Sequence, residues 1–172
     1  MDKRVVVAVT IASLALSFLL HLPTDAVTTL TGYTPPPPIG SVYSDIIAGV
    51  YGPIFEDPSL CPSATSDRWI DRAALQDLCR GVPRFYLPYR DYVLEYPPLV
   101  GALWALSTNL GFAAAGLRAG PEAPAEARAV AKLVHYAVQS AAIGAAALVL
   151  MRELWRVSEK AGLSRLYVIL PL

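Results

Sequence analysis

The segment VVVAVTIASLALSFLLHLPT, from Val5 to Thr24, contains no aspartate, glutamate, lysine or arginine. Two further segments share this property, Pro97 to Leu117 and Leu133 to Met151. Each of the three is 19 to 21 residues long, which as an α-helix matches the roughly 30 Å hydrocarbon core of a membrane. A soluble helix of this length carries a polar face, and these segments do not. The sequence therefore predicts three membrane-spanning helices.

The composition of the 172 residues agrees with a membrane protein. Hydrophobic residues make up 55% of the chain and charged residues 16%, against about a quarter charged in a typical soluble domain. The formal net charge is zero, so no overall field attracts nucleic acid, and no nucleic-acid partner is expected. The expected fold is an all-α integral membrane protein, a multi-span helical bundle with a long external loop that carries short amphipathic helices.

A fourth apolar segment begins at Leu166 and stops at Leu172 after seven residues. Seven helical residues cover about 10 Å, a third of a membrane. We therefore expect the front part of a longer protein, or one piece of a split protein in which a second chain supplies the missing helices.

The charges divide the chain into a first transmembrane helix (1–24), an external loop (25–95) and further transmembrane helices (96–172, with spans at about 97–117 and 133–151 and the start of a fourth at 166). Lys3 and Arg4 precede the first span and favour a cytoplasmic N-terminus. The segment from Pro23 to Glu95 has nine acidic residues, five arginines and no lysine, which suits the outer face. The expected location is the cell membrane, with several crossings and the long loop outside.

The direction of the third span stays open. Simple alternation makes residues 152–165 external, yet this segment has four basic residues, Arg152, Arg156, Lys160 and Arg165. The positive-inside rule instead places such a segment in the cytoplasm. We follow alternation here because the first helix usually dominates orientation.

Two short helices are expected in the external loop. Ser41 is a suitable N-cap for a helix from Val42 to Tyr51. Asp45 lies off the apolar face of this helix, among small residues that leave room around its carboxylate. Ser66 likewise caps a helix from Asp67 to Arg80, which lies either along the membrane surface or against the rest of the loop.

Both cysteines, Cys61 and Cys79, lie in this loop. Two thiols in an oxidising compartment favour a disulfide, with two buried free thiols as the alternative. The bridge would stabilise the loop by roughly 3 kcal/mol on the chain-entropy model.

The loop ends in RFYLPYRDYVLEYPPL, residues Arg84 to Leu99, which contains four tyrosines. This clustering fits an aromatic belt at the membrane interface. It also fits a sugar-binding surface, because tyrosine offers a flat apolar ring and a hydroxyl. Pro97-Pro98 suits the first turn of the second span, where backbone N–H groups need no partner.

Polar side chains also lie within the predicted spans. His135 and Gln139 are four residues apart and share one face of the third span, and Asn109 lies in the second. Hydrogen bonding between helices is expected for them in preference to catalysis. A small-residue surface for close helix packing follows, formed by Ala141, Ala142, Gly144, Ala145 and Ala146. There is no His/Cys metal spacing and no phosphate-binding glycine loop, so neither a metal nor a cofactor is expected.

Two motifs together carry a family resemblance. Tyr43-Ser44-Asp45-Ile46 follows the first span, and Pro88-Tyr89-Arg90-Asp91-Tyr92 continues through Glu95-Tyr96-Pro97-Pro98-Leu99 into the second. Over roughly Val5 to Met151 the chain resembles the N-terminal part of a GT-C fold glycosyltransferase, in particular the polyprenol-phosphate-sugar-dependent membrane enzymes of glycosyltransferase family 87. In that superfamily the first external loop carries membrane-parallel helices and a catalytic aspartate, and the second span often opens with Tyr-Pro-Pro-Leu.

The resemblance implies transfer of a sugar, a hexose such as mannose, from a polyprenyl-phosphate carrier to a hydroxyl of a glycan or lipid acceptor at the external face. It implies Asp45 as the general base. Arg90 would stabilise the departing phosphate or contact lipid phosphates, and Asp91 and Glu95 would hold acceptor hydroxyls or cap the second span. The implied substrate-binding residues are Tyr43, Tyr89, Arg90, Asp91, Glu95 and Tyr96.

Two other functions are considered. The first is a non-catalytic membrane subunit, or the remnant of a split enzyme, that scaffolds a partner. The second is a transporter or channel, which the absence of charged residues and of paired broken helices in the spans disfavours.

Overall fold

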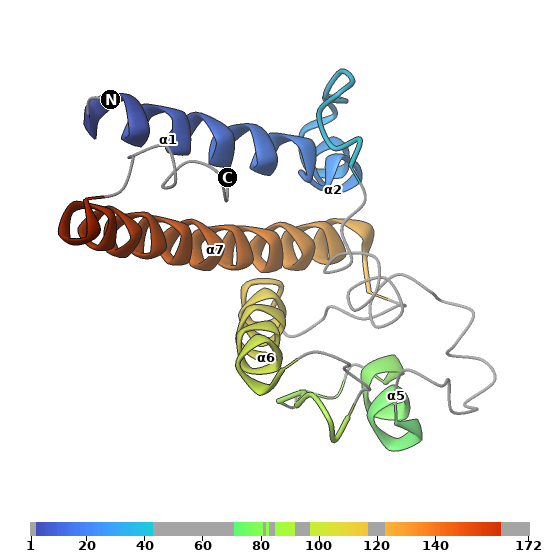
Figure 1. Cartoon of the computed structure of the whole chain (residues 1–172). Coiled ribbons are helices and arrows are strands. Elements are labelled where there is room, and N and C mark those ends of the chain that lie inside the picture. Colours follow the sequence, from blue (N-terminus) through green and yellow to red (C-terminus); the bar gives the residue numbers. More distant parts are fainter. Residues whose placement is uncertain are drawn as a thin grey trace. The chain divides into compact units, whose positions relative to one another are not determined.

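The computed structural model describes residues 3–42, 71–80, 82, 85–91, 97–116 and 123–162. All regular elements in these ranges are helices (Figure 1). They are α1 (Lys3–Leu20), α2 (Thr24–Thr31), α5 (Arg72–Cys79), α6 (Pro98–Ala114) and α7 (Ala125–Ala161). The all-α part of the predicted fold is thereby confirmed for the described residues.

The prediction of a multi-span bundle is not confirmed by the described residues. Within the described ranges, α7 is the one helix long and apolar enough by itself to cross a membrane. The segments Arg4–Leu20 and Thr24–Thr31 satisfy the same criteria only when they are counted together as one bent pair. α6 is shorter, with 17 residues. Length and composition therefore allow one crossing, or up to two with the bent pair, and the predicted second span corresponds to α6, an apolar helix of 17 residues.

α7 is much longer than the predicted third span. It has 37 residues, which corresponds to about 55 Å, whereas the charge-free stretch from Leu133 to Met151 is 19 residues long. The helix continues at both ends through residues such as alanine, arginine, glutamate and lysine, which have high helix propensity. Polar helical turns therefore flank the apolar part of α7 on both sides.

The chain forms two compact units, Met1–Leu20 with Ser140–Leu172, and His21–Gln139. In the first unit, α1 lies beside the second half of α7 (Figure 1). Thr10 Oγ1 lies 3.2 Å from Met151 Sδ, and a Cβ on Gly144 would lie 3.6 Å from the ring of Phe18. Phe18 comes after Thr10 in α1, whereas its contact Gly144 comes before Met151 in α7. The two helices are therefore antiparallel. The predicted small-residue surface contributes Gly144 to this packing.

In the second unit, α6 crosses the first half of α7 at close range. A Cβ on Gly111 would lie only 2.6 Å from the carbonyl oxygen of Ala131, and Ala131 is buried. The absence of a side chain at Gly111 thus lets the two backbones approach, as small residues do where membrane helices pack.

α2 is joined to α7 within the same unit by an ion pair. Lys132 Nζ lies 2.6 Å from Asp25 Oδ2, with the lysine side chain buried and the aspartate exposed. Asp25 lies in the first turn of α2, and Gly32 ends this helix in the left-handed conformation, φ 70°, which glycine adopts without steric cost. This pairing of Lys132 is not predictable from local sequence, because its partner is 107 positions away.

The second predicted loop helix is shorter than expected in the described residues. α5 begins at Arg72, and Asp71 provides its cap, since Asp71 Oδ1 accepts hydrogen bonds from the N–H groups of Ala73 (2.9 Å) and Ala74 (3.2 Å). The predicted cap Ser66 and the helix predicted from Val42 to Tyr51 lie outside the described residues, apart from Val42.

Candidate functional site: an anchored aromatic turn

The turn of residues 85–91 precedes α6 and is held together by Asp91. The N–H of Asp91 donates to the carbonyl of Leu87 (2.9 Å), and the N–H of Leu87 donates to Asp91 Oδ2 (2.7 Å). Asp91 is only 2% exposed. Its own carbonyl accepts a hydrogen bond from the N–H of Asp71 (2.8 Å), which ties the turn to the start of α5. The Asp91 side chain therefore fixes the shape of the turn from inside.

Asn109 fastens this turn to α6. Its Oδ1 accepts a hydrogen bond from the N–H of Tyr86 (3.0 Å), and its Nδ2 donates to the carbonyl of Tyr86 (3.0 Å). Nδ2 also donates to the carbonyl of Ala105 (2.6 Å). The Tyr86 ring is buried and lies 5.1 Å from the ring of Phe112, centroid to centroid. Asn109 was predicted to form a hydrogen bond to another helix, and this prediction is wrong. Asn109 instead bonds the backbone of Tyr86, because the turn folds back onto α6.

The anchored turn presents Tyr89 and Arg90 at the surface. Tyr89 is 53% exposed and has φ 64°. This left-handed conformation is uncommon for residues other than glycine and costs roughly 1–2 kcal/mol. Such strain persists where surrounding contacts determine the backbone, and it is concentrated at functional sites. The turn is therefore the strongest candidate site among the described residues.

Arg90 supplies a positive charge beside Tyr89. Its Nη2 and Nε atoms donate to Asp91 at 2.7 and 3.1 Å, and Nη2 also lies 3.3 Å from the carbonyl oxygen of Phe85. The hydrogen bond to Asp91 raises the pKa of Arg90 above its ordinary value, so the guanidinium stays charged. Its side chain is 59% exposed, and among the described residues nothing bonds its Nη1 group. An exposed aromatic ring beside a guanidinium is suited to a ligand with an apolar face and an anionic group.

Several predicted site residues lie outside the described residues, namely Tyr43, Asp45, Cys61, Glu95 and Tyr96. The structure brings Tyr89, Arg90 and Asp91 together in one turn, with Asp91 inside it. Cys79 is disulfide-bonded, and because Cys61 is not described, the pairing of these two cysteines stays a prediction.

His135 and Gln139 lie in a buried polar cluster between α6 and α7. Ser107 Oγ lies 3.0 Å from His135 Nδ1 and accepts a hydrogen bond from Gln139 Nε2 (2.8 Å). Thr108 Oγ1 is 3.3 Å from the same imidazole nitrogen. The predicted hydrogen bonding between helices is confirmed for both residues. The cluster has no exposed side chain, and no group of three metal-ligating side chains occurs among the residues that the structure covers.

Comparisons with known proteins gave no match for this chain: no family model, no curated protein and no solved structure corresponds to it.

Proposed function

We propose that this chain is the N-terminal part of a membrane glycosyltransferase that transfers a sugar from a polyprenyl-phosphate carrier to an acceptor hydroxyl at the external membrane face. The family resemblance of its two motifs supports the reaction class. The observation that carries the proposal is Tyr89, an exposed residue with a strained backbone, in a turn whose buried anchors are Asp91 and Asn109. Maintaining such a conformation at an exposed tyrosine is expected where the tyrosine binds a ligand.

The proposed roles follow from side-chain chemistry. The Tyr89 ring stacks on a sugar face, and Arg90 pairs with the carrier phosphate through charge-assisted hydrogen bonds. The acceptor hydroxyl attacks the anomeric carbon, the bond from that carbon to the phosphate oxygen breaks, and Asp45 takes the hydroxyl proton. The polyprenyl phosphate leaves with the bonding electron pair. Asp91 acts as a positioning residue for the turn, and Glu95 remains a proposed contact for the acceptor.

The proposed topology has the N-terminus in the cytoplasm and residues 25–95 outside. The antiparallel packing of α1 and α7 places the N-terminal end of α1 and the C-terminal end of α7 at the same end of the first unit. If both helices cross, α7 returns the chain to the cytoplasm, in agreement with the positive-inside rule for the four basic residues at positions 152–165, three of which lie in the last turns of α7. We therefore propose that the third span, α7, runs from the external face to the cytoplasm, which is the reverse of the direction that simple alternation gives. α6 is then not a crossing, which accords with its 17 residues, eight of them buried.

A scaffold function is the second candidate. Its supporting observation is the apolar exposed surface of α7, where Ile143, Leu148, Val149 and Leu150 are each at least 43% exposed. These side chains suit contact with lipid or with helices of a second chain.

The test is transfer of labelled hexose from a polyprenyl-phosphate donor, in membranes that contain this chain together with the products of its neighbouring reading frames. Tyr89→Ala and Arg90→Gln should each lower transfer at least tenfold, equivalent to about 1.4 kcal/mol of transition-state stabilisation. Tyr33→Ala is the matched control, because Tyr33 is also exposed and has no proposed role. Equal transfer by Tyr89→Ala, Arg90→Gln and Tyr33→Ala would exclude this site. Absence of transfer by the unsubstituted chain with every hexose donor would favour the scaffold function.

A further inference from the structure

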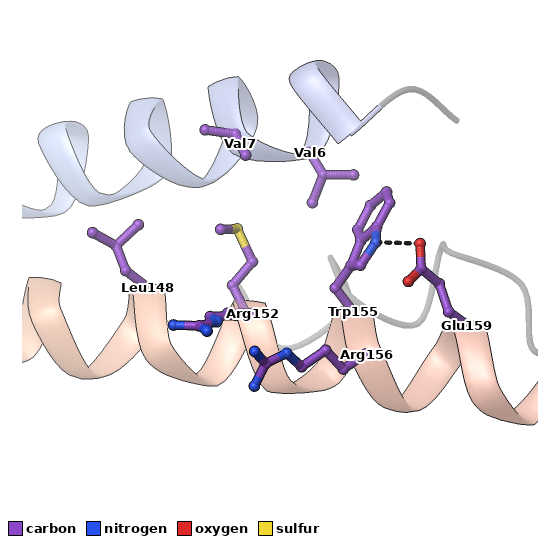
Figure 2. A pocket seen from close by; sticks show the side chains of 8 residues that line it. Val6, Val7, Leu148, Arg152, Trp155, Arg156 and Glu159 are labelled. Carbon is purple, nitrogen blue, oxygen red and sulfur yellow. Dashed lines mark hydrogen bonds between the residues drawn. The ribbon is translucent and has the colours of Figure 1, made fainter.

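A groove lies between α1 and α7 in the first unit and holds about 770 Å³ (Figure 2). Val6 and Val7 line it from α1, and Leu148 lines it from α7. Farther along α7 the lining changes to Arg152, Trp155, Arg156 and Glu159. The groove therefore has an apolar part and a part that is mainly basic. Figure 2 shows Trp155 reaching toward α1 with Glu159 beside it, while Arg152 and Arg156 lie along α7.

The basic part coincides with the basic ends of both helices. α1 begins with Lys3 and Arg4, and the last turns of α7 carry Arg152, Arg156 and Lys160. Only two acidic residues, Glu153 and Glu159, occur in the same turns. The antiparallel packing of the helices brings these two groups of charges to one end of the unit.

The two acidic residues are already engaged. Arg156 Nη1 lies 2.8 Å from Glu153 Oε1, in an exposed pair that contributes little stability. Glu159 accepts a hydrogen bond from Trp155 Nε1 (2.7 Å). Among the described residues no carboxylate pairs with Arg152. The lining, with Arg152 and Arg156 against Glu159, thus keeps one net positive charge beside its apolar part, and Arg152 is the cation that no described carboxylate pairs.

We propose that this groove binds one anionic phospholipid, with the headgroup phosphate on Arg152 and Arg156 and an acyl chain along Val6, Val7 and Leu148. Arginine binds phosphate oxygens through its planar donors, and tryptophan prefers the headgroup level of a bilayer. The basic end is cytoplasmic in the proposed topology, so this site differs from the external sugar-transfer site. The inference rests on the membrane location proposed above, and it is independent of glycosyl transfer.

The test uses fluorescence quenching of Trp155 in the full chain reconstituted in vesicles. Trp69→Phe and Trp104→Phe leave Trp155 as the single tryptophan, since the sequence has three. Brominated-acyl phosphatidylglycerol is compared with brominated-acyl phosphatidylcholine at equal mole fraction. The anionic lipid should quench about fivefold more effectively, as expected for a basic side chain near an anionic lipid. The double variant Arg152→Gln, Arg156→Gln should reduce the ratio of the two to near one.

Two variants act as controls. Arg152→Lys with Arg156→Lys keeps the charge and should keep most of the preference, and Lys160→Gln, which removes a charge of the same helix end but not of the groove lining, should keep all of it. Inorganic phosphate added to the vesicles should not compete. If it abolishes the preference, the site binds free anions and the lipid proposal is overturned.

The remaining outcomes separate this inference from the membrane proposal. Quenching by brominated phosphatidylcholine reports only that Trp155 lies at a bilayer. If this lipid does not quench Trp155, the proposed membrane location itself is overturned. Equal quenching by the two lipids, or a preference that persists in the Arg152→Gln, Arg156→Gln variant, would overturn the lipid site while leaving the membrane location intact.

Discussion

The side-chain amide of Asn109 bonds both backbone groups of Tyr86, at 3.0 Å to its N–H and 3.0 Å to its carbonyl. One side chain thus pairs both the N–H and the carbonyl of a residue 23 positions earlier in the chain, as the backbone of a neighbouring strand does in a β-sheet. All of these atoms are in buried residues, where an unpaired polar group costs about 1–3 kcal/mol. The position of the exposed turn that follows depends on this contact.

Asn109→Ala should therefore loosen the turn. The substitution leaves the buried N–H and carbonyl of Tyr86 unpaired. A destabilisation of roughly 1.4 kcal/mol would increase the population of molecules with an open turn about tenfold. The measurement is the rate of tryptic cleavage after Arg90 in the folded protein. Cleavage after Arg156, on α7, serves as the internal control and should not change. An unchanged rate after Arg90 would mean that Asn109 does not hold the turn.

Tyr89→Gly should stabilise the protein and reduce its activity. Glycine adopts φ 64° without the cost of a Cβ, so removing roughly 1 kcal/mol of strain should raise Tm by about 2–4 °C for a chain of this size. Sugar transfer should fall because the ring is lost. Tyr33→Gly is the control: Tyr33 is not in the left-handed region, so glycine there should lower Tm through the entropy of the unfolded chain. A decrease in Tm for both variants would argue against strain at Tyr89.

The two helix contacts made by glycine should respond differently to alanine. Gly111→Ala places a Cβ 2.6 Å from the backbone oxygen of Ala131, so α6 must move away from α7 at a cost of about 1–3 kcal/mol. Gly144→Ala places its Cβ 3.6 Å from the Phe18 ring, an ordinary contact, and should leave stability nearly unchanged. Thermal unfolding in detergent measures both. Equal effects would show that the close approach at Gly111 is not needed for stability.

Accessibility of single cysteines tests the proposed topology. In a chain without its natural cysteines, Val157→Cys should resist a membrane-impermeant thiol reagent in intact cells and react after lysis, because Val157 is exposed and lies in the basic end of α7. Ser63→Cys, in the loop expected outside, should react in intact cells. Labelling of Val157→Cys in intact cells would restore simple alternation of the spans.

Asp45 should be the residue that sugar transfer can least spare. Asp45→Asn keeps the size of the side chain but removes the proton acceptor, so turnover should fall by about 10² to 10⁴. Glu95→Gln should cause a smaller loss, as befits a residue that positions the acceptor. The assay is the hexose transfer described above. Near-normal turnover in Asp45→Asn together with loss in Glu95→Gln would assign the base to Glu95.

Local chemistry made part of the structure predictable. The apolar composition predicted helices, and the proline pair at 97–98 marked the start of α6, which begins at Pro98 because proline suits the first helical turn. The spacing of His135 and Gln139 predicted a shared face, and both contact Ser107. These features depend on residues within one or two turns of each other, so the sequence by itself determined them.

Only the tertiary structure decided the long-range contacts. Asn109 was expected to bond another helix and instead bonds Tyr86 in the loop, and Lys132 pairs with Asp25 across 107 positions. The packing of α1 against α7 likewise brings the basic start of α1 and the basic last turns of α7 to one end of the first unit. Helical periodicity states which side chains share a face, but it does not state which helix that face meets or in which direction, because packing of distant segments is settled by the fit of whole surfaces.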